Sequence, residues 1–270
     1  MDIIKNITDL ATHLENNPVN YKYYSADVAL TALKKKTLQF THPNGFNDPF
    51  DSNVNLFKFD KDDVTQYVVD VINKHKISED HGAYMYRQLQ TLVSQNPKEY
   101  MQNIFDEENL GRGITCFSKK FNQMQMWAHY ADKHKGICIG YDLFKIKDTI
   151  ADVNKESAFI PVNYVNEIVA LSNFTDINTI FHWFGTKHSF WSYEEEVRLI
   201  SRPFDYSKEN KCLFPIQKEN VIEIYCGYNI NEIDLNNLKD ILRSDYPHVK
   251  LFQIQPDYDA FTLEREEICF

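Results

Sequence analysis

The sequence predicts an α+β fold organised as a single domain. Short segments with strand-like alternation are interspersed with separate helical segments, and they do not follow the regular strand–helix–strand order of a parallel α/β fold. The 270 residues are 43% hydrophobic, which is enough to fill a sizeable core. No internal repeat, low-complexity tract or linker divides the chain. We therefore expect one domain over residues 1–270, with small, mixed, mostly antiparallel sheets.

Hydrophobic periodicity assigns the elements of the first 110 residues. We expect helices over 1–14 and 26–36, strands at 21–25 and 37–42, and an ordered loop over 42–50. The first helix ends near Pro18, and the region of Ser25 and Asp27 caps the second. From about residue 59 to 110 the pattern is helical, notably over 61–76 and 83–95, with a break at 96–100. This stretch is predicted to be a helical insertion.

Strand signals dominate the rest of the chain. We expect strands at 113–118, 136–142, 159–165, 195–202, 221–229 and 249–255, and helices at 122–135, 175–191 and 232–245. The helices lie between groups of strands rather than after every strand. This order is typical of an α+β protein.

The overall charge and the cysteines narrow the function classes. With 39 acidic against 29 basic side chains, the formal net charge is -10, which disfavours nonspecific binding to nucleic acid and leaves specific recognition open. Five scattered cysteines, without a CxxC pair, are typical of reduced thiols and not of a disulfide framework or structural zinc site. The N-terminal segment lacks the apolar core of a signal peptide, and no stretch approaches a membrane span. We expect a cytoplasmic protein without a membrane partner.

The decapeptide "WAHYADKHKG" (127–136) is the first candidate functional segment. His129 and His134 are five residues apart, about 140° on a regular helix, which is a poor geometry for chelating a metal. One interpretation is structural, with Trp127 and Tyr130 buried and Gly136 ending the helix in a left-handed conformation. The other is that His129 and Tyr130 line a pocket.

The segment "WSYEEEVRLI" (191–200) is the second candidate. Alternation along a strand puts Glu194, Glu196 and Arg198 on one face. Because Val197 and Leu199 on the opposite face favour the core, the charged face is expected to meet solvent or a polar cleft. An exposed, self-neutralising row of charges is the structural interpretation. The neighbouring aromatic residues favour a cleft that holds a ring-bearing ligand.

Two shorter segments contribute further candidates. In "NGFNDPFD" (44–51), Asn47 and Asp48 can lock the loop through side-chain to backbone bonds. Alternatively, Asp48 and Asp51 contact the hydroxyls of a ligand or a cation, and Asn47 is a further candidate for cofactor binding. In "YKYYS" (21–25), a strand alternates Tyr21 and Tyr23 with Lys22 and Tyr24. The common signatures of nucleotide-binding loops, α/β-hydrolases and zinc proteases are absent.

These stretches occur in a recognisable order: "YKYYS", "FNDPFD", "CFS", "MWAHYADKHKGICIGYD", "VNY", and a lysine ahead of "WSYEEEVRLI". In this order the sequence resembles the bacterial domain-of-unknown-function family numbered 2971, from about residue 21 to 230. That resemblance assigns no activity, since the function of the family is not established.

A looser resemblance is to ADP-ribosyltransferases, which hold NAD in a split sheet. It implies that Lys22 or Tyr23 on an early strand, Ser118 with Tyr130 in the middle, and Glu196 late in the chain carry the corresponding roles. Here "YEEE" is similar to the Glu-x-Glu motif of such enzymes.

Under this resemblance each residue type has a physical role. The Glu196 carboxylate stabilises the positive charge that develops on the ribose as nicotinamide leaves. Arg198 holds the glutamate or a diphosphate oxygen, while Ser118 and Tyr23 position the ribose and stack on the nicotinamide ring. The acceptor is a nucleic acid base or a protein side chain, as in toxins and phage-defence effectors.

Three functional hypotheses follow from the sequence. The first is an ADP-ribosyltransferase-like enzyme with Glu194, Glu196 and Arg198 as catalytic residues. The second is a noncatalytic sensor module that binds a nucleotide or peptide in the same cleft. The third is a hydrolase or nuclease that uses Asp48, Glu194 and Glu196 with a divalent metal. In all three, His129 and Tyr130 are expected to face the Glu196 cleft while Trp127 packs in the core.

Overall fold

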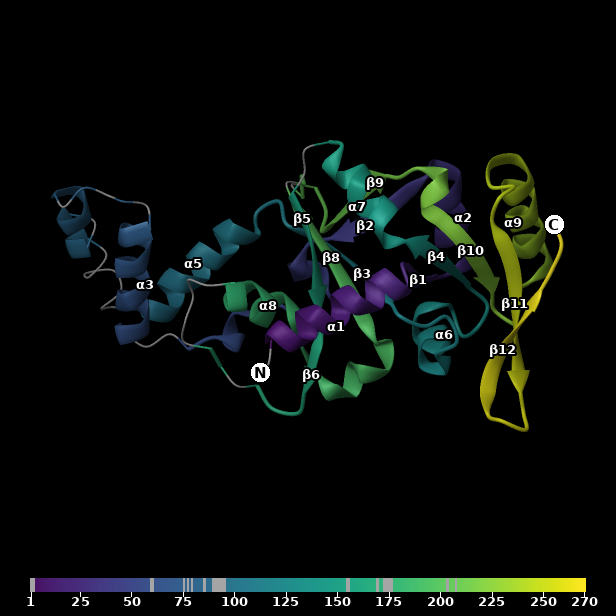
Figure 1. Cartoon of the computed structure of the whole chain (residues 1–270), viewed down its shortest axis with the longest axis horizontal. Helices are drawn as coiled ribbons and strands as arrows, with labels where there is room; N and C mark the ends of the chain where they lie inside the picture. Colours follow the sequence, from purple (N-terminus) through teal and green to yellow (C-terminus); the bar gives the residue numbers. More distant parts are fainter. Residues whose placement is uncertain are drawn as a thin grey trace.

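The chain folds around one large mixed sheet with helices on both faces (Figure 1). The computed structural model describes residues 3–58, 61–74, 76, 78, 80–84, 86–88, 96–153, 156–168, 170–171, 177–202, 204–206 and 208–270. In Figure 1, α3 and α5 lie at one end of the molecule and α9, β11 and β12 at the other. The predicted α+β class and the helical insertion at about 59–110 are confirmed.

The elements in the described part of the chain are as follows. The helices are α1 (Ile3–Asn16), α2 (Ala26–Lys35), α3 (Lys61–Lys74), α5 (Pro97–Asn109), α6 (Met124–Tyr130), α7 (Leu143–Ala151), α8 (Ile177–Gly185) and α9 (Glu232–Asp245). Short 3-10 helices are η1 (Pro43–Gly45), η2 (Val54–Leu56), η3 (Ser189–Glu194) and η4 (Lys218–Asn220). The strands are β1 (Val19–Tyr24), β2 (Thr37–Thr41), β3 (Gly113–Ser118), β4 (Ile137–Asp142), β5 (Glu156–Pro161), β6 (Asn163–Val165), β7 (Thr186–His188), β8 (Glu196–Arg202), β9 (Lys211–Pro215), β10 (Val221–Cys226), β11 (Lys250–Asp257) and β12 (Thr262–Glu267).

The sheet forks at β3. One edge of β3 pairs along its whole length with β8, from Gly113↔Ser201 to Ser118↔Glu196. The other edge is shared, because β1 pairs with it at Tyr21↔Ser118 and β2 at Thr41↔Ile114. The strand order β12-β11-β10-β4-β1-β3-β2-β9 therefore opens between β1 and β2. Backbone groups in the middle of that β3 edge need partners from elsewhere.

Three clusters of buried side chains cover the faces of the sheet. The main core packs α2, α7 and α9 against one face and includes Ile139, Val197 and Leu199. On the opposite face, α5 and α8 pack around Trp183 over one half of the sheet, and α6 packs around Trp127 over the other half. The fork lies between these two smaller clusters, which leaves the middle of this face open for a pocket.

The structure corrects the expected end of the helix over 122–135. The helix α6 ends at Tyr130, and the left-handed residues that follow are Asp132, Lys133 and His134, with φ of 42°, 54° and 66°. Gly136 is therefore not the left-handed terminator. Only glycine fits at position 136, because a Cβ there would lie 2.0 Å from the Tyr24 carbonyl oxygen.

Other boundaries also differ from the sequence expectation. The helix expected over 175–191 is α8 followed by the strand β7 and by η3. The stretch 96–100 begins a helix, because Asn96 caps α5 and Pro97 occupies its first turn, where proline is tolerated. The expected helix over 83–95 lies largely outside the described residues. The pattern did not predict α7, β7, β9 or β12.

None of the helices in the described part of the chain has the length and apolar character needed to cross a lipid bilayer.

Candidate functional site

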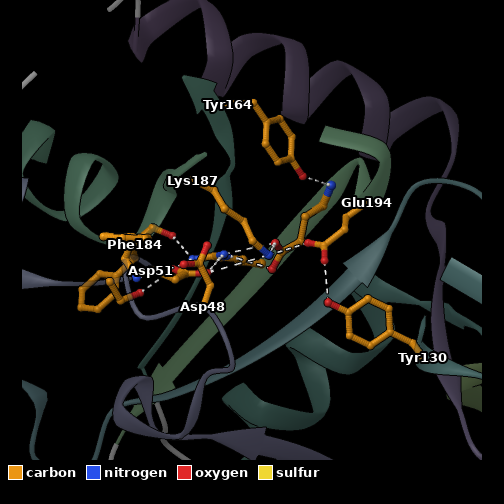
Figure 2. Close-up of polar contacts among 11 residues, drawn as sticks. Asp48, Asp51, Tyr130, Tyr164, Phe184, Lys187 and Glu194 are labelled. Atoms are coloured by element: carbon orange, nitrogen blue, oxygen red, sulfur yellow. Dashed lines mark hydrogen bonds and ion pairs between the residues drawn. The ribbon is translucent and has the colours of Figure 1, made fainter. Parts of the chain in front are cut away.

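A pocket of about 150 Å³ opens where the sheet forks. Its described lining combines aromatic rings with ionisable groups: Tyr21, Lys22, Tyr23, Phe46, Asn47, Asp51, Cys116, Phe117, Ser118, Met126, Tyr130, Lys187, Glu194 and Glu196. Side chains from β1, β3, β7, β8, α6 and the loop after β2 meet there, although they are far apart in the sequence. Figure 2 shows the polar contacts at this site.

The three consecutive glutamates separate at the start of β8. Glu195 adopts a left-handed conformation, with φ of 42°, and its carboxylate leaves the pocket to contact Gln123 and Lys120 at 2.7 and 2.6 Å. Glu194 ends η3 and Glu196 begins β8, and both are at least 95% buried. The backbone turn therefore directs Glu194 and Glu196 inward and Glu195 outward.

Arg198 is fully buried and joins two carboxylates to the end of a helix. Its guanidinium donates to Asp51 Oδ1 and Oδ2 at 2.7 and 2.6 Å and to Glu196 Oε1 and Oε2 at 2.9 and 3.1 Å. It also donates to the Phe184 carbonyl at 2.8 Å, in the last turn of α8, where carbonyls lack helical partners and favour a cation. Such bidentate pairing fixes the planes of both carboxylates.

Lys187 connects Glu194 to Glu196 (Figure 2). Its ammonium donates to Glu194 Oε2 at 2.5 Å and to Glu196 Oε2 at 3.1 Å, and it lies 3.9 Å from Asp51 Oδ2. The Tyr130 hydroxyl donates to Glu194 Oε1 at 2.7 Å. Glu194 is thus held between the end of α6 and the short strand β7.

Burial and charge move the pKa values of the two glutamates in opposite directions. Desolvation and the nearby Glu196 carboxylate raise the pKa of Glu194 above its ordinary value of 4.5. Desolvation also opposes the ionised form of Glu196, but Arg198 and Lys187 outweigh it and hold its pKa well below the ordinary value. Two adjacent carboxylates that differ in this way are suited to different roles in proton transfer and charge stabilisation.

Lys22 lies at the fork between β1 and β3. Its ammonium donates to the Cys116 carbonyl at 3.0 Å, a backbone acceptor on the shared edge of β3. Desolvation lowers the pKa of Lys22. Lys187 is paired with carboxylates. Lys22, by contrast, lines the pocket with its ammonium bonded to a backbone carbonyl.

The structure brings most of the sequence-predicted residues to the pocket. Glu194, Glu196, Lys22, Tyr23, Asn47, Ser118 and Tyr130 line it, and Arg198 lies behind Glu196. Trp127 is fully buried and Val197 and Leu199 belong to the main core, as expected. The row of charges on β8 is buried, so the solvent-exposed interpretation is wrong.

Two predicted residues lie elsewhere. His129 does not line the pocket, because its position on α6 leaves the ring exposed, where Nδ1 lies 3.0 Å from the Tyr193 hydroxyl. Asp48 is buried within the loop and does not belong to the described lining of the pocket. Its Oδ1 accepts from the Phe50 amide at 2.9 Å, which confirms that it locks the loop. Its Oδ2 has no hydrogen-bond partner.

For three residues that organise the site, the sequence does not predict the contacts that they make. Lys187 stood in the quoted motif order, but nothing in its neighbourhood indicated a contact with both glutamates. The sequence predicts Asp51 only as a ligand contact and not as the partner of Arg198. The Tyr164 hydroxyl accepts from the Glu196 backbone amide at 3.0 Å, and its motif "VNY" carried no sign of this bond.

The carboxylates of the cluster are paired with side-chain cations. In the part of the chain that the structure describes, no group of three or more His, Cys, Asp or Glu side chains is arranged to hold a metal ion. Lys187 and Arg198 instead take the carboxylate oxygens of Asp51, Glu194 and Glu196. The arrangement is a network of ion pairs between side chains at the wall of the pocket.

A comparison with known protein families gives a match to a segment that carries part of the site. No curated protein and no solved structure matches the chain. The matched segment runs from α6 into β8, and it is narrower than the resemblance expected over 21–230. It contains Tyr130, Lys187 and both pocket glutamates. Residues 126–199 match the family described as "Protein of unknown function (DUF2971)", which confirms the resemblance to that family over this segment.

Proposed function

We propose that the protein is an ADP-ribosyltransferase-like enzyme that cleaves the nicotinamide N-glycosidic bond of NAD at the fork of the sheet. The observation that carries this proposal is the pair Glu194 and Glu196, two buried carboxylates whose pKa values are shifted in opposite directions at one pocket. Cleavage of a glycosidic bond makes positive charge on the sugar, and paired carboxylates are the groups that stabilise it and manage protons.

The hydrogen bonds divide the work between the two glutamates. Glu196 accepts from Arg198 twice and from Lys187, so both of its oxygens are engaged and it acts as a fixed anion. Glu194 accepts from Lys187 and Tyr130, which leaves lone pairs for a ligand. We assign the ribose contact and the proton acceptance to Glu194, not to Glu196 as the sequence alone implied.

The proposed reaction transfers ADP-ribose from nicotinamide to an acceptor. The bond between ribose C1′ and the nicotinamide nitrogen breaks, and its electron pair leaves with nicotinamide. The anionic Glu196 stabilises the developing charge on the ribose. An acceptor oxygen or nitrogen forms the new bond to C1′ and gives its proton to Glu194. The acceptor is a nucleic acid base, a protein side chain or water.

The size of the pocket sets how NAD is held. At about 150 Å³ the pocket is smaller than the roughly 300–1,000 Å³ of sites that enclose a whole ligand. It suits the nicotinamide ring and its ribose, with Tyr23 and Phe46 as aromatic walls. Lys22 is the cation available to an oxygen of the diphosphate or to the carboxamide oxygen.

The proposal is tested by nicotinamide release from NAD. We expect the purified protein, given NAD and a cell lysate as a source of acceptors, to release nicotinamide, and Glu194→Gln to reduce kcat by about 10²–10⁴-fold, as loss of a general base does. Glu195→Gln is the matched control, because it makes the same change in the adjacent residue, whose carboxylate leaves the pocket. Absence of release by the wild-type protein, or equal activity of both variants, contradicts the proposal.

The occupied oxygens of Glu196 favour one alternative. A carboxylate that is held by Arg198 and Lys187 is also what a rigid, noncatalytic binding pocket requires. A sensor module binds the nucleotide without turnover. NAD binding by calorimetry with no nicotinamide release, and with affinity lost in Glu194→Gln, supports this second function.

A further inference from the structure

A second cavity adjoins the pocket on the other side of Lys187. Its volume is about 330 Å³, within the range of cavities that enclose small ligands. Its described lining consists of Phe50, Leu56, Val165, Asn166, Glu167, Ile168, Thr186, Lys187 and His188. Lys187 belongs to the walls of both cavities, so the two are neighbours.

The loop after β2 also takes part in both walls. Asn47 and Asp51 line the first pocket, while Phe50, between them in sequence, lines the second cavity. The bond from the Phe50 amide to Asp48 and the bond from the Asp51 amide to the Asp48 carbonyl, at 2.9 and 3.2 Å, hold this turn. The loop and Lys187 therefore form a partition between two compartments of one site.

The second cavity offers apolar surface together with polar groups, among which Asn166 and His188 supply hydrogen-bond donors beside Glu167, Thr186 and Lys187. Phe50, Leu56, Val165 and Ile168 supply the apolar surface. Asn166 accepts from the Ser189 hydroxyl through Oδ1 at 2.5 Å, so its amide NH₂ is left to donate. His188 Nδ1 accepts from the Phe190 amide at 3.1 Å, so its neutral ring carries the proton on Nε2 as a second donor.

The rim of this cavity exposes aromatic rings. Phe50 is 63% exposed and Phe190 is 82% exposed. The Phe190 ring lies 4.3 Å from the His188 ring, which places it beside the cavity lining. Exposed rings next to an apolar cavity are suited to stacking on a planar ligand.

We propose that this second cavity binds the purine base of a nucleotide or nucleoside. A flat, uncharged heterocycle fills the apolar walls, and its ring nitrogens accept from Asn166 and His188. Phosphate is not expected here, because the cation in the lining, Lys187, already donates to Glu194 and Glu196. The base comes either from the adenine end of NAD or from a second molecule, the acceptor. Only this choice of source rests on the proposed function.

Adenosine binding tests the cavity without requiring any reaction. By titration calorimetry we expect wild-type protein to bind adenosine and Ile168→Asp to bind it at least about tenfold more weakly, because a carboxylate in the cavity must be desolvated beneath the base. Ile168 is 46% exposed, so the substitution does not disturb the core. Ile233→Asp on α9, where Ile233 is 74% exposed, is the matched control. No adenosine binding by the wild-type protein, or equal binding by the two variants, overturns the proposal.

The source of the base is read from kinetics with two substrates. If the cavity holds the adenine of NAD, Ile168→Asp raises KM for NAD and leaves KM for nicotinamide mononucleotide unchanged. If it holds the acceptor, nicotinamide release from NAD in water is unchanged and transfer to the acceptor is lost. If adenosine binds as expected and NAD is not cleaved, the cavity assignment stands and the proposed function fails.

Discussion

At the scale of single residues, the site is an unbalanced charge network. Asp51, Glu194 and Glu196 supply three buried carboxylates, while Lys187 and Arg198 supply two cations in contact with them. One carboxylate therefore exceeds the cations. The raised pKa of Glu194 identifies it as the member that most readily takes up a proton. Glu194 thus provides a proton-accepting carboxylate in the wall of the pocket, where a ligand can contact it.

Replacement of Arg198 tests how strongly the network stabilises the fold. Arg198→Met removes the guanidinium that pairs with the buried carboxylates of Asp51 and Glu196 and leaves only Lys187, among the described cations, in contact with both, and we expect the free energy of unfolding to fall by about 3–5 kcal/mol. Urea denaturation followed by circular dichroism measures it.

Arg202→Met is the control on the same strand. Arg202 pairs with Glu156 at 2.8 Å, with side chains 43% and 75% exposed, and an exposed pair contributes at most about 1 kcal/mol. Equal losses in the two variants would show that the buried network has no special weight.

Replacement of Tyr130 tests the pKa of Glu194. The Tyr130 hydroxyl bonds the ionised form of Glu194 and so lowers its pKa, against the larger effects of desolvation and Glu196. Without the hydroxyl the pKa of Glu194 rises further. We therefore expect Tyr130→Phe to move the acidic limb of the kcat/KM profile for NAD to higher pH by about one unit.

Tyr193→Phe serves as the control for this shift. The Tyr193 hydroxyl lies 3.0 Å from His129 and makes no bond to the glutamates. An acidic limb that stays in place in Tyr130→Phe, or that moves equally in both variants, would remove Glu194 from the proton-accepting role.

At the scale of elements, the turn after α6 illustrates why its boundary was misjudged. Glycine after a helix usually indicates a left-handed terminator, but here Asp132, Lys133 and His134 take those conformations. Gly136 is needed for a tertiary reason, the close approach of the Tyr24 carbonyl. Contacts between segments more than a hundred residues apart are invisible to a local pattern.

Gly136→Ala tests this close approach. A Cβ would lie 2.0 Å from the Tyr24 carbonyl oxygen and 2.8 Å from Ala131 Cα, so backbone must move, and we expect a loss of at least about 1–3 kcal/mol in the free energy of unfolding. Gly82→Ala is the control, because among the described residues a Cβ there would approach Ile72 Cγ2, the end of a side chain, at 3.2 Å and no backbone atom. Thermal unfolding of both variants decides, and an unaltered midpoint in Gly136→Ala contradicts the steric account.

The strand β8 shows what local pattern does predict. Alternation alone placed Val197 and Leu199 toward the core and Glu196 with Arg198 on the other face, and the structure has this arrangement. The left-handed Glu195 was not predictable, since a glutamate carries no local signal for positive φ. Even so, Glu194 reached the same cluster, because the turn at Glu195 directs it inward.

At the scale of the whole molecule, the sequence predicts the helices and strands better than the contacts between them. The α+β class and the long helix α9 follow from periodicity, which is a local property. The fork at β3, the pairing of Asp51 with Arg198 and the contact of Lys187 with both glutamates depend on which segments meet. Short elements such as β7 offered too few residues for a period to emerge. The candidate site was therefore predictable as residues and not as a network.

The fork has a consequence for any ligand that recruits Lys22. A strand that pairs with β3 would satisfy its backbone permanently, whereas here the Cys116 carbonyl depends on a side chain. A ligand that draws the ammonium away breaks that bond and must offer the carbonyl a donor of its own, or lose about 1–3 kcal/mol of affinity to an unpaired acceptor. The divided sheet thus favours ligands that carry both an anionic group, which binds Lys22, and a hydrogen-bond donor, which binds the Cys116 carbonyl.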